Sequence, residues 1–338
     1  MWWIYPVYVI LLCLVVFLSI KLADLVDLLD KKTKISGAFI GGVLLAAVTS
    51  LPELFTSISS VLIVKQPELV IGNIVGSDIF NLMVLSLYSI FFFKTFRNGS
   101  VAKWHFVSLI FLIVMYGLTA YAVFAPEKWQ PMLGSINAIS IVLFIIYVIL
   151  VIKQPKESEP SEEAEIKSNM TLKSIIIWFI VSSIFLIGAS IGITYVTDLI
   201  TKELPWLSGS VAGAILLGVG TSLPEVISTF SLFRKKNFDA GYGNMIGSCT
   251  FNFSILAISD FISWKNWNGE LITNRGIFIS TTDSKQLVIF GLITTVALGS
   301  ILAIKLFSKF FEEKKLSAIL CGFLAAIAFT SYLLVFII

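Results

Sequence analysis

The sequence predicts an all-α protein that crosses a membrane ten times. Three observations predict this fold: a composition too apolar for a water-soluble surface, apolar stretches of bilayer-spanning length, and two motifs that each occur twice. Of the 338 residues, 57% are hydrophobic and only 13% are charged, with a mean hydropathy of +0.95. Soluble domains carry about 25% charged residues, so the chain belongs to the membrane class.

Ten apolar segments are long enough to span a bilayer, which needs roughly 20 residues per helix. They lie at residues 5–26, 36–64, 68–93, 102–124, 132–152, 172–197, 207–233, 239–263, 285–307 and 316–337. A polar stretch rich in Glu and Lys separates the first five segments from the second five. We therefore divide the chain into a first five-helix repeat (1–152), an acidic linker (153–171) and a second five-helix repeat (172–338).

The distribution of basic residues predicts the orientation in the membrane. Connections that follow odd-numbered segments, with their flanks, carry 18 of the 24 Lys and Arg residues, and the opposite side carries 6. By the positive-inside rule the basic side is cytoplasmic. The acidic linker is then cytoplasmic, and both termini of this multi-pass plasma-membrane protein are extracellular. The first segment lacks a basic leader and a cleavage site, so we expect a retained helix and not a signal peptide.

The composition does not indicate a nucleic-acid partner, a disulfide framework or a zinc site. The net charge of +3 is too small to indicate a nucleic-acid partner. Three cysteines, Cys13, Cys249 and Cys321, lie far apart in apolar sequence, which argues against a disulfide framework and against a zinc site. We expect no cofactor, and we expect the lipid bilayer to surround a protein that functions as a monomer.

The repeat is visible at two places in each half. Residues 36–53 and 208–225 share ten identities in eighteen positions, and both end in Thr-Ser-Leu-Pro-Glu. Residues 72–81 and 243–252 share Gly-Asn-x-x-Gly-Ser-x-x-Phe-Asn, so the motif regions run over 36–81 and 208–252. Because each half has five segments, an odd number, the second half enters the membrane from the opposite side. Inverted repeats of this kind are typical of alternating-access transporters.

Each Thr-Ser-Leu-Pro-Glu motif places a carboxylate and two hydroxyls on one helix face, three and four residues apart. The proline of each motif also frees a backbone carbonyl one turn earlier. Oxygen ligands of these kinds suit hard cations such as Ca²⁺, Na⁺ or Mg²⁺. The residues are Thr49, Ser50 and Glu53 in the first copy, and Thr221, Ser222 and Glu225 in the second.

The second motif adds a polar line at i, i+4 and i+8 on an otherwise apolar helix. One such line could serve only to hydrogen-bond neighbouring helices, whereas two lines paired with two glutamates favour a shared site. The residues are Asn73, Ser77 and Asn81 in the first half, and Asn244, Ser248 and Asn252 in the second.

The buried charge of the predicted segments is negative only. Glu53, Asp78 and Glu225 lie deep in their segments, and no Lys or Arg does. A buried carboxylate must be paired, protonated or bound to a metal. With no fixed cation available, the counter-charge has to come from solution, as metal ions or as protons.

The paired Thr-Ser-Leu-Pro-Glu and Gly-Asn-x-x-Gly-Ser motifs resemble the alpha repeats of the cation/calcium exchanger superfamily, most of all its prokaryotic sodium/calcium exchanger branch. These motifs cover about a third of the chain. The resemblance implies that Glu53 and Glu225 bind Ca²⁺ with backbone oxygens of Thr49 and Thr221. The remaining implied ligands are Ser50, Ser77, Ser222 and Ser248 for Na⁺, with the carbonyls of Ala46 and Gly218, and Asn81 and Asn252 at the central position. Asn73, Asn244 and Asp78 would lie beside this site.

The function that follows is a secondary antiporter, not an enzyme, that exchanges Ca²⁺ for Na⁺ across the plasma membrane by alternating access. Three alternatives stay open: the same fold driven by protons, with Asp78 or a glutamate carrying H⁺; a cation channel; and an intramembrane hydrolase, which lacks a convincing nucleophile–base pair. The chain departs from the family pattern at Val48, Asp78 and Cys249. The Glu-to-Ser spacing is also 24 residues in one copy and 23 in the other. We therefore expect the two halves of the site to differ.

Overall fold

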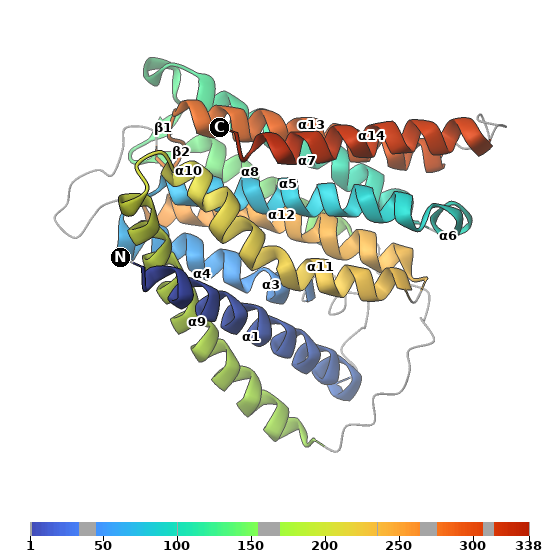
Figure 1. Cartoon of the computed structure of the whole chain (residues 1–338), viewed down its shortest axis with the longest axis horizontal. Coiled ribbons are helices and arrows are strands. Elements are labelled where there is room, and N and C mark those ends of the chain that lie inside the picture. Colours follow the sequence, from blue (N-terminus) through green and yellow to red (C-terminus); the bar gives the residue numbers. More distant parts are fainter. Residues whose placement is uncertain are drawn as a thin grey trace.

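The computed structural model describes residues 2–33, 45–99, 101–154, 170–234, 236–263, 276–306 and 314–337. Nearly all of this part of the chain is helical (Figure 1). The long helices are α1 (Ile4–Thr33), α5 (Glu68–Phe91), α7 (Lys103–Phe124), α8 (Ala138–Lys153), α9 (Leu172–Glu203), α11 (Val219–Arg234), α12 (Phe238–Ile262), α13 (Thr282–Leu306) and α14 (Lys314–Leu334). The short elements are α3 (Leu45–Thr49), α4 (Leu51–Ser59), η2 (Ser60–Val64), α6 (Phe93–Asn98), η3 (Glu127–Trp129), α10 (Gly209–Ala212) and η4 (Gly213–Gly218).

Eight of the helical segments in these ranges are long and apolar enough to cross a membrane, and they coincide with eight of the ten predicted segments. The other two predictions, 36–64 and 132–152, meet shorter apolar helices, Leu51–Val64 and Ala138–Lys153. The protein is therefore an all-α polytopic membrane protein. Residues 34–44, where the first motif begins, and 155–169 of the linker lie outside the described residues.

The predicted start of the fifth segment is wrong by six residues. Residues 132–137 form a two-stranded antiparallel hairpin, β1 (Met132–Leu133) and β2 (Ile136–Asn137). Gly134 turns the hairpin with a φ of +66°, a conformation that costs glycine little. Helix α8 begins only at Ala138, where the Asn137 side chain caps it by accepting a bond from the Ile139 N–H at 3.0 Å.

Helices α5 and α12 form the centre of the bundle. In each of them 72% of the apolar window is buried, against 22% in α1 and 28% in α9 and α14. Figure 1 shows α5 and α12 between α13 and α14 on one side and α1 and α9 on the other. The outer helices expose many large apolar side chains, as helices that face lipid do. The polar motifs of α5 and α12 thus lie in the most enclosed part of the molecule.

The two central helices run in opposite directions. Near one end, the hydroxyls of Ser89 on α5 and Tyr242 on α12 are 2.5 Å apart. Near the middle, Asp78 on α5 accepts a hydrogen bond from Asn252 on α12 at 2.9 Å. Sequence numbers rise along one helix as they fall along the other. The corresponding helices of the two halves are therefore antiparallel neighbours.

Candidate functional site

The two Thr-Ser-Leu-Pro-Glu motifs, far apart in the sequence, meet in the structure. The Ser50 hydroxyl donates to Oε1 of Glu225 at 3.0 Å, and the Ser222 hydroxyl donates to Oε1 of Glu53 at 3.3 Å. Glu53 is 1% exposed and Glu225 is 0% exposed. Each half of the chain therefore supplies a hydroxyl to the carboxylate of the other half, deep inside the protein.

The chain breaks differently at the two motifs. In the first, α3 ends at Thr49, Ser50 adopts φ −91° and ψ 12°, and Pro52 lies in the first turn of α4, where a missing N–H is not needed. In the second, Pro224 lies inside α11, and the irregularity comes earlier, in the π-helical η4. Wide turns of this type are frequent at functional sites. The two copies of the motif therefore have different backbone conformations.

The serines of the second motif also differ between the halves. Ser77 on α5 donates to the carbonyl of Gly218, the last residue of η4, at 3.0 Å. The structure therefore joins two of the residues that sequence assigned to the site. Its counterpart on α12, Ser248, is buried and makes no hydrogen bond to the described residues. The Ala46 carbonyl accepts instead from Thr49 Oγ1 at 3.2 Å and from the Ser50 N–H at 3.1 Å.

Asn73 and Asn244 hydrogen-bond to the helices that carry the two glutamates. The amide nitrogen of Asn73 donates to the Glu53 carbonyl (3.2 Å) and to the hydroxyls of Thr56 and Ser57 (2.9 Å each). The amide nitrogen of Asn244 donates to the Glu225 carbonyl at 3.4 Å and to the Thr229 hydroxyl at 3.1 Å. No repeated motif in the sequence pointed to these hydroxyls. Their position about one turn after each glutamate puts them on the same helix face, and this spacing could have identified them.

Several buried oxygen atoms of the site have no hydrogen-bond partner among the described residues. An unsatisfied buried polar group costs roughly 1–3 kcal/mol, and native proteins keep few of them. The described residues contain no group of three or more His, Cys, Asp or Glu that could hold a metal. A cation bound here would therefore need hydroxyl, amide and carbonyl oxygens beside the two carboxylates. The unpartnered atoms are Oε2 of Glu53 and Glu225, Oδ1 of Asn73, Asn81, Asn244 and Asn252, and Oγ of Ser248.

Asp78, whose role the sequence left open, lies against one of these residues. Its Oδ1 accepts from the amide nitrogen of Asn252 at 2.9 Å, and its Oδ2 accepts from the Tyr116 hydroxyl at 3.2 Å. Tyr116 comes from α7 and was not anticipated, because no motif or spacing connects it with the repeats.

The salt bridges found in the described part of the chain lie outside the site. They join His105 to Asp239 at 2.9 Å and Lys202 to Asp198 at 2.6 Å. Neither involves Glu53, Asp78 or Glu225.

On one side of the site, α5 packs directly on the backbone of α10 and η4. A Cβ atom built on Gly72 would lie 2.1 Å from the Ser210 carbonyl oxygen, and one on Gly76 would lie 2.3 Å from the Ala214 Cα. One on Gly213 would lie 2.5 Å from the Leu69 carbonyl oxygen. We call these contacts the α5–η4 seam. Only glycine allows such an approach of two helices.

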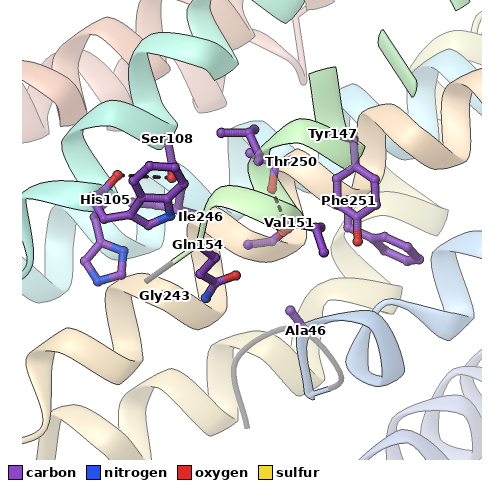
Figure 2. Close-up of a pocket in the computed structure, with 13 residues that line it drawn as sticks. Ala46, His105, Ser108, Tyr147, Val151, Gln154, Gly243, Ile246, Thr250 and Phe251 are labelled. Atoms are coloured by element: carbon purple, nitrogen blue, oxygen red, sulfur yellow. Dashed lines mark hydrogen bonds between the residues drawn. The ribbon is translucent and has the colours of Figure 1, made fainter. Parts of the chain in front are cut away.

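On the other side, the matching glycines of α12 face a pocket of about 50 Å³ (Figure 2). The α12 pocket is lined by Gly243, Gly247 and Thr250 of α12, by Trp104, His105 and Ser108 of α7, by four residues of α8 and its end, and by Ala46 of α3. Among the described residues, Cβ atoms on Gly243 and Gly247 would meet the His105 ring and the Ala46 side chain, both at 3.3 Å. Residues 41–46 correspond to η4 in the repeat, and 41–44 of them lie outside the described residues.

Helical spans around crossed carboxylate–serine pairs define a membrane protein with an oxygen-rich site between two similar halves. Solved structures share the fold: native YfkE (TM-score 0.66, 14% identity, 98% of this chain and 92% of that chain) and the H⁺/Ca²⁺ exchanger CAX (0.63, 13%, 98% and 88%). A third is the sodium-calcium exchanger NCX_Mj soaked with Na⁺ and Sr²⁺ (0.54, 20%, 97% and 98%).

The model of the family described as sodium/calcium exchanger protein matches residues 3–153 and 174–338, and the chain belongs to this family. A curated relative, the human (Homo sapiens) sodium/potassium/calcium exchanger 5, is 32% identical over 94 residues. That match covers 27% of this chain and 19% of the relative, so it relates a limited part of the two proteins.

Proposed function

We propose that the protein is a secondary antiporter that exchanges Ca²⁺ for Na⁺ across the plasma membrane by alternating access. It makes and breaks no covalent bond, and it works as a monomer without a cofactor. The observation that carries the proposal is the crossed pair of bonds, Ser50 to Glu225 and Ser222 to Glu53, between carboxylates whose Oε2 atoms have no hydrogen-bond partner among the described residues.

In this proposal Glu53 and Glu225 hold Ca²⁺ together, and Na⁺ competes for the same carboxylates. The two hydroxyl bonds mark where a cation would sit, since an ion that binds the carboxylates displaces hydroxyl hydrogens and meets hydroxyl oxygens instead. The contact of Ser77 with the Gly218 carbonyl supports a Na⁺ position in the first half. The remaining assigned ligands are Thr49, Thr221, Ser248, Asn81, Asn252 and Ala46.

We also propose that ten spans form two inverted five-helix repeats, with both termini outside. The antiparallel contacts of α5 with α12 and of one Thr-Ser-Leu-Pro-Glu motif with the other support this arrangement, because inverted repeats require it. The distribution of basic residues, 18 against 6, supports the orientation.

Proteoliposomes test the exchange directly. We expect vesicles loaded with Na⁺ to accumulate ⁴⁵Ca²⁺ when diluted into choline buffer, and to lose this uptake when Na⁺ is equal on both sides. Uptake should saturate with Ca²⁺ and should generate no single-channel currents in planar bilayers. Current steps would instead favour a channel, and uptake that ignores the Na⁺ gradient would contradict Na⁺ coupling.

A proton-driven exchanger of the same fold is the second candidate. The similarity to the H⁺/Ca²⁺ exchanger CAX and the buried third carboxylate, Asp78, favour it. In the same vesicles, a pH gradient without Na⁺ would then drive ⁴⁵Ca²⁺ uptake, and a protonophore would abolish it. Under Na⁺ coupling, the protonophore leaves the uptake intact.

A further inference from the structure

Asp78 is the acidic group of the site that the crossed pairs do not use. It is fully buried in the middle of α5, next to Ser77 and one turn before Asn81. Both of its oxygens accept hydrogen bonds: Oδ1 from Asn252 on α12 and Oδ2 from Tyr116 on α7. Asp78 thus joins three helices beside the two glutamates.

The bond to Asp78 decides which way the Asn252 side chain faces. A carboxamide carries its donor nitrogen and its acceptor oxygen on opposite sides. In the structure the Asn252 nitrogen donates to Oδ1 of Asp78, and the other Asp78 oxygen accepts from the Tyr116 hydroxyl. The nitrogen is therefore held at Asp78, and Oδ1 is turned the other way. That Oδ1 is buried and has no partner among the described residues.

Asp78 is itself held in place. Tyr116, which donates to it, packs edge-on against Phe253 of α12, with ring centroids 4.9 Å apart and planes at 84°. The Tyr116 ring also fills the space beside Gly291 of α13, where a Cβ atom would lie 2.4 Å from it. The carboxylate and its tyrosine are thus wedged among four helices, which limits their movement.

The described residues of the other half contain no equivalent arrangement. The residue that corresponds to Asp78 in the second motif is Cys249, and the residue that corresponds to Asn252 is Asn81. A thiol is a weak donor and a weak acceptor, and the hydrogen bond of Cys249 joins it to Asp78 itself. The Asn81 oxygen has no hydrogen-bond partner among the described residues.

From this geometry we propose that Asp78 is a positioning residue: it fixes the Asn252 carboxamide so that its oxygen is presented to the transported cation. The proposal rests on the proposed function, because it assumes that Asn252 contacts the ion. Asp78 acts through Asn252 and does not bind the ion.

A double-mutant cycle on Ca²⁺ binding tests the proposal, with ⁴⁵Ca²⁺ binding to purified protein in detergent as the readout. Asp78→Asn keeps the size of the side chain but can present either an oxygen or an NH₂ group to Asn252, so Asn252 is free to flip. We expect the dissociation constant to rise by up to about tenfold, the upper net value of one hydrogen bond. In an Asn252→Ala background the same change should shift it by less than roughly twofold.

The matched control is the same cycle with Asn81→Ala, in which the full effect of Asp78→Asn should persist. If Asp78→Asn has the same effect with and without the Asn252 side chain, Asp78 does not act through Asn252 and the proposal is wrong. Tyr116→Phe, which removes only a hydroxyl, should give a smaller shift in the same direction that also disappears with Asn252→Ala. It carries the test if Asp78→Asn does not fold.

The reversed pair, Asp78→Asn with Asn252→Asp, gives a second readout. It keeps a hydrogen bond between the two positions with donor and acceptor exchanged, so we expect tighter Ca²⁺ binding than with Asn252→Asp alone, where two carboxylates face each other. Failure of this rescue counts against the proposal. Failure of the proposed function looks different: Glu53→Gln would then bind Ca²⁺ normally, whatever the cycle shows.

Discussion

The two halves of the site carry nearly the same motifs but differ in backbone and in contacts. In the first half, α3 ends at the motif and Ser77 donates to the Gly218 carbonyl. In the second half, α11 runs through the motif with Pro224 inside it, and Ser248 has no hydrogen-bond partner among the described residues. Like motifs therefore fix which groups line the site and leave open which contacts each group makes.

The largest effect should come from the carboxylates, where the halves are most alike. We expect Glu53→Gln and Glu225→Gln each to eliminate Ca²⁺ transport, because each substitution halves the charge available to the ion while the fold persists. Vesicle ⁴⁵Ca²⁺ uptake measures the loss, and gel filtration of the purified variant checks the fold. Glu127→Gln, on an exposed residue of η3, is the control with normal uptake. Normal exchange in either variant would show that the substituted glutamate does not bind the ion.

The next effect should separate the two sides. Gly76→Ala places a methyl group 2.3 Å from the Ala214 Cα, so backbone must move, and overpacking of this kind typically costs about 1–3 kcal/mol. Among the described residues, the new methyl group of Gly243→Ala meets the His105 ring at 3.3 Å. We expect Gly76→Ala to lower the melting temperature in detergent clearly and Gly243→Ala to change it little. Equal effects would show that the α12 side is packed as tightly as the α5–η4 seam.

The smallest effect should come from the crossed serines. Ser50→Ala and Ser222→Ala each remove one hydroxyl from a carboxylate of the other half, at 3.0 and 3.3 Å. A hydrogen bond to a charged group is worth roughly 1.5–3 kcal/mol, and we expect the lower end of that range because the ion keeps its other ligands, so half-saturation by Na⁺ should need about tenfold more Na⁺. The Na⁺ dependence of ⁴⁵Ca²⁺ uptake gives this value. An unchanged Na⁺ dependence in both variants would show that neither serine contributes to Na⁺ binding.

Much of the fold can be predicted from local features of the sequence. The apolar lengths predict eight of the spans well, because a bilayer imposes its thickness on helices. Helix ends were less predictable: α9 continues to Glu203, six residues beyond the expected end at 197, and 132–137 turn as a hairpin around Gly134. Turn residues and caps decide such ends, and the hydropathy of a segment does not contain them.

Part of the candidate site was likewise predictable from the sequence, and part was not. Composition and spacing predicted Glu53, Glu225 and their serines as site residues, because a carboxylate within an apolar helix is costly and is usually functional. The crossing of Ser50 to Glu225 could not be read from the sequence, since it depends on how two distant segments dock. Tyr116 was invisible for the same reason: it lies on an otherwise ordinary apolar helix and matters only because α7 passes beside Asp78.

The crossed bonds also bear on how such a protein could be divided. Ser50 satisfies Glu225, and Ser222 satisfies Glu53, so neither half contains a complete pair. Either half of the chain made alone would bury a carboxylate whose serine hydroxyl donor belongs to the missing half. Two separately encoded halves would have to find each other during insertion, and a change in one gene would alter the chemistry supplied by the other.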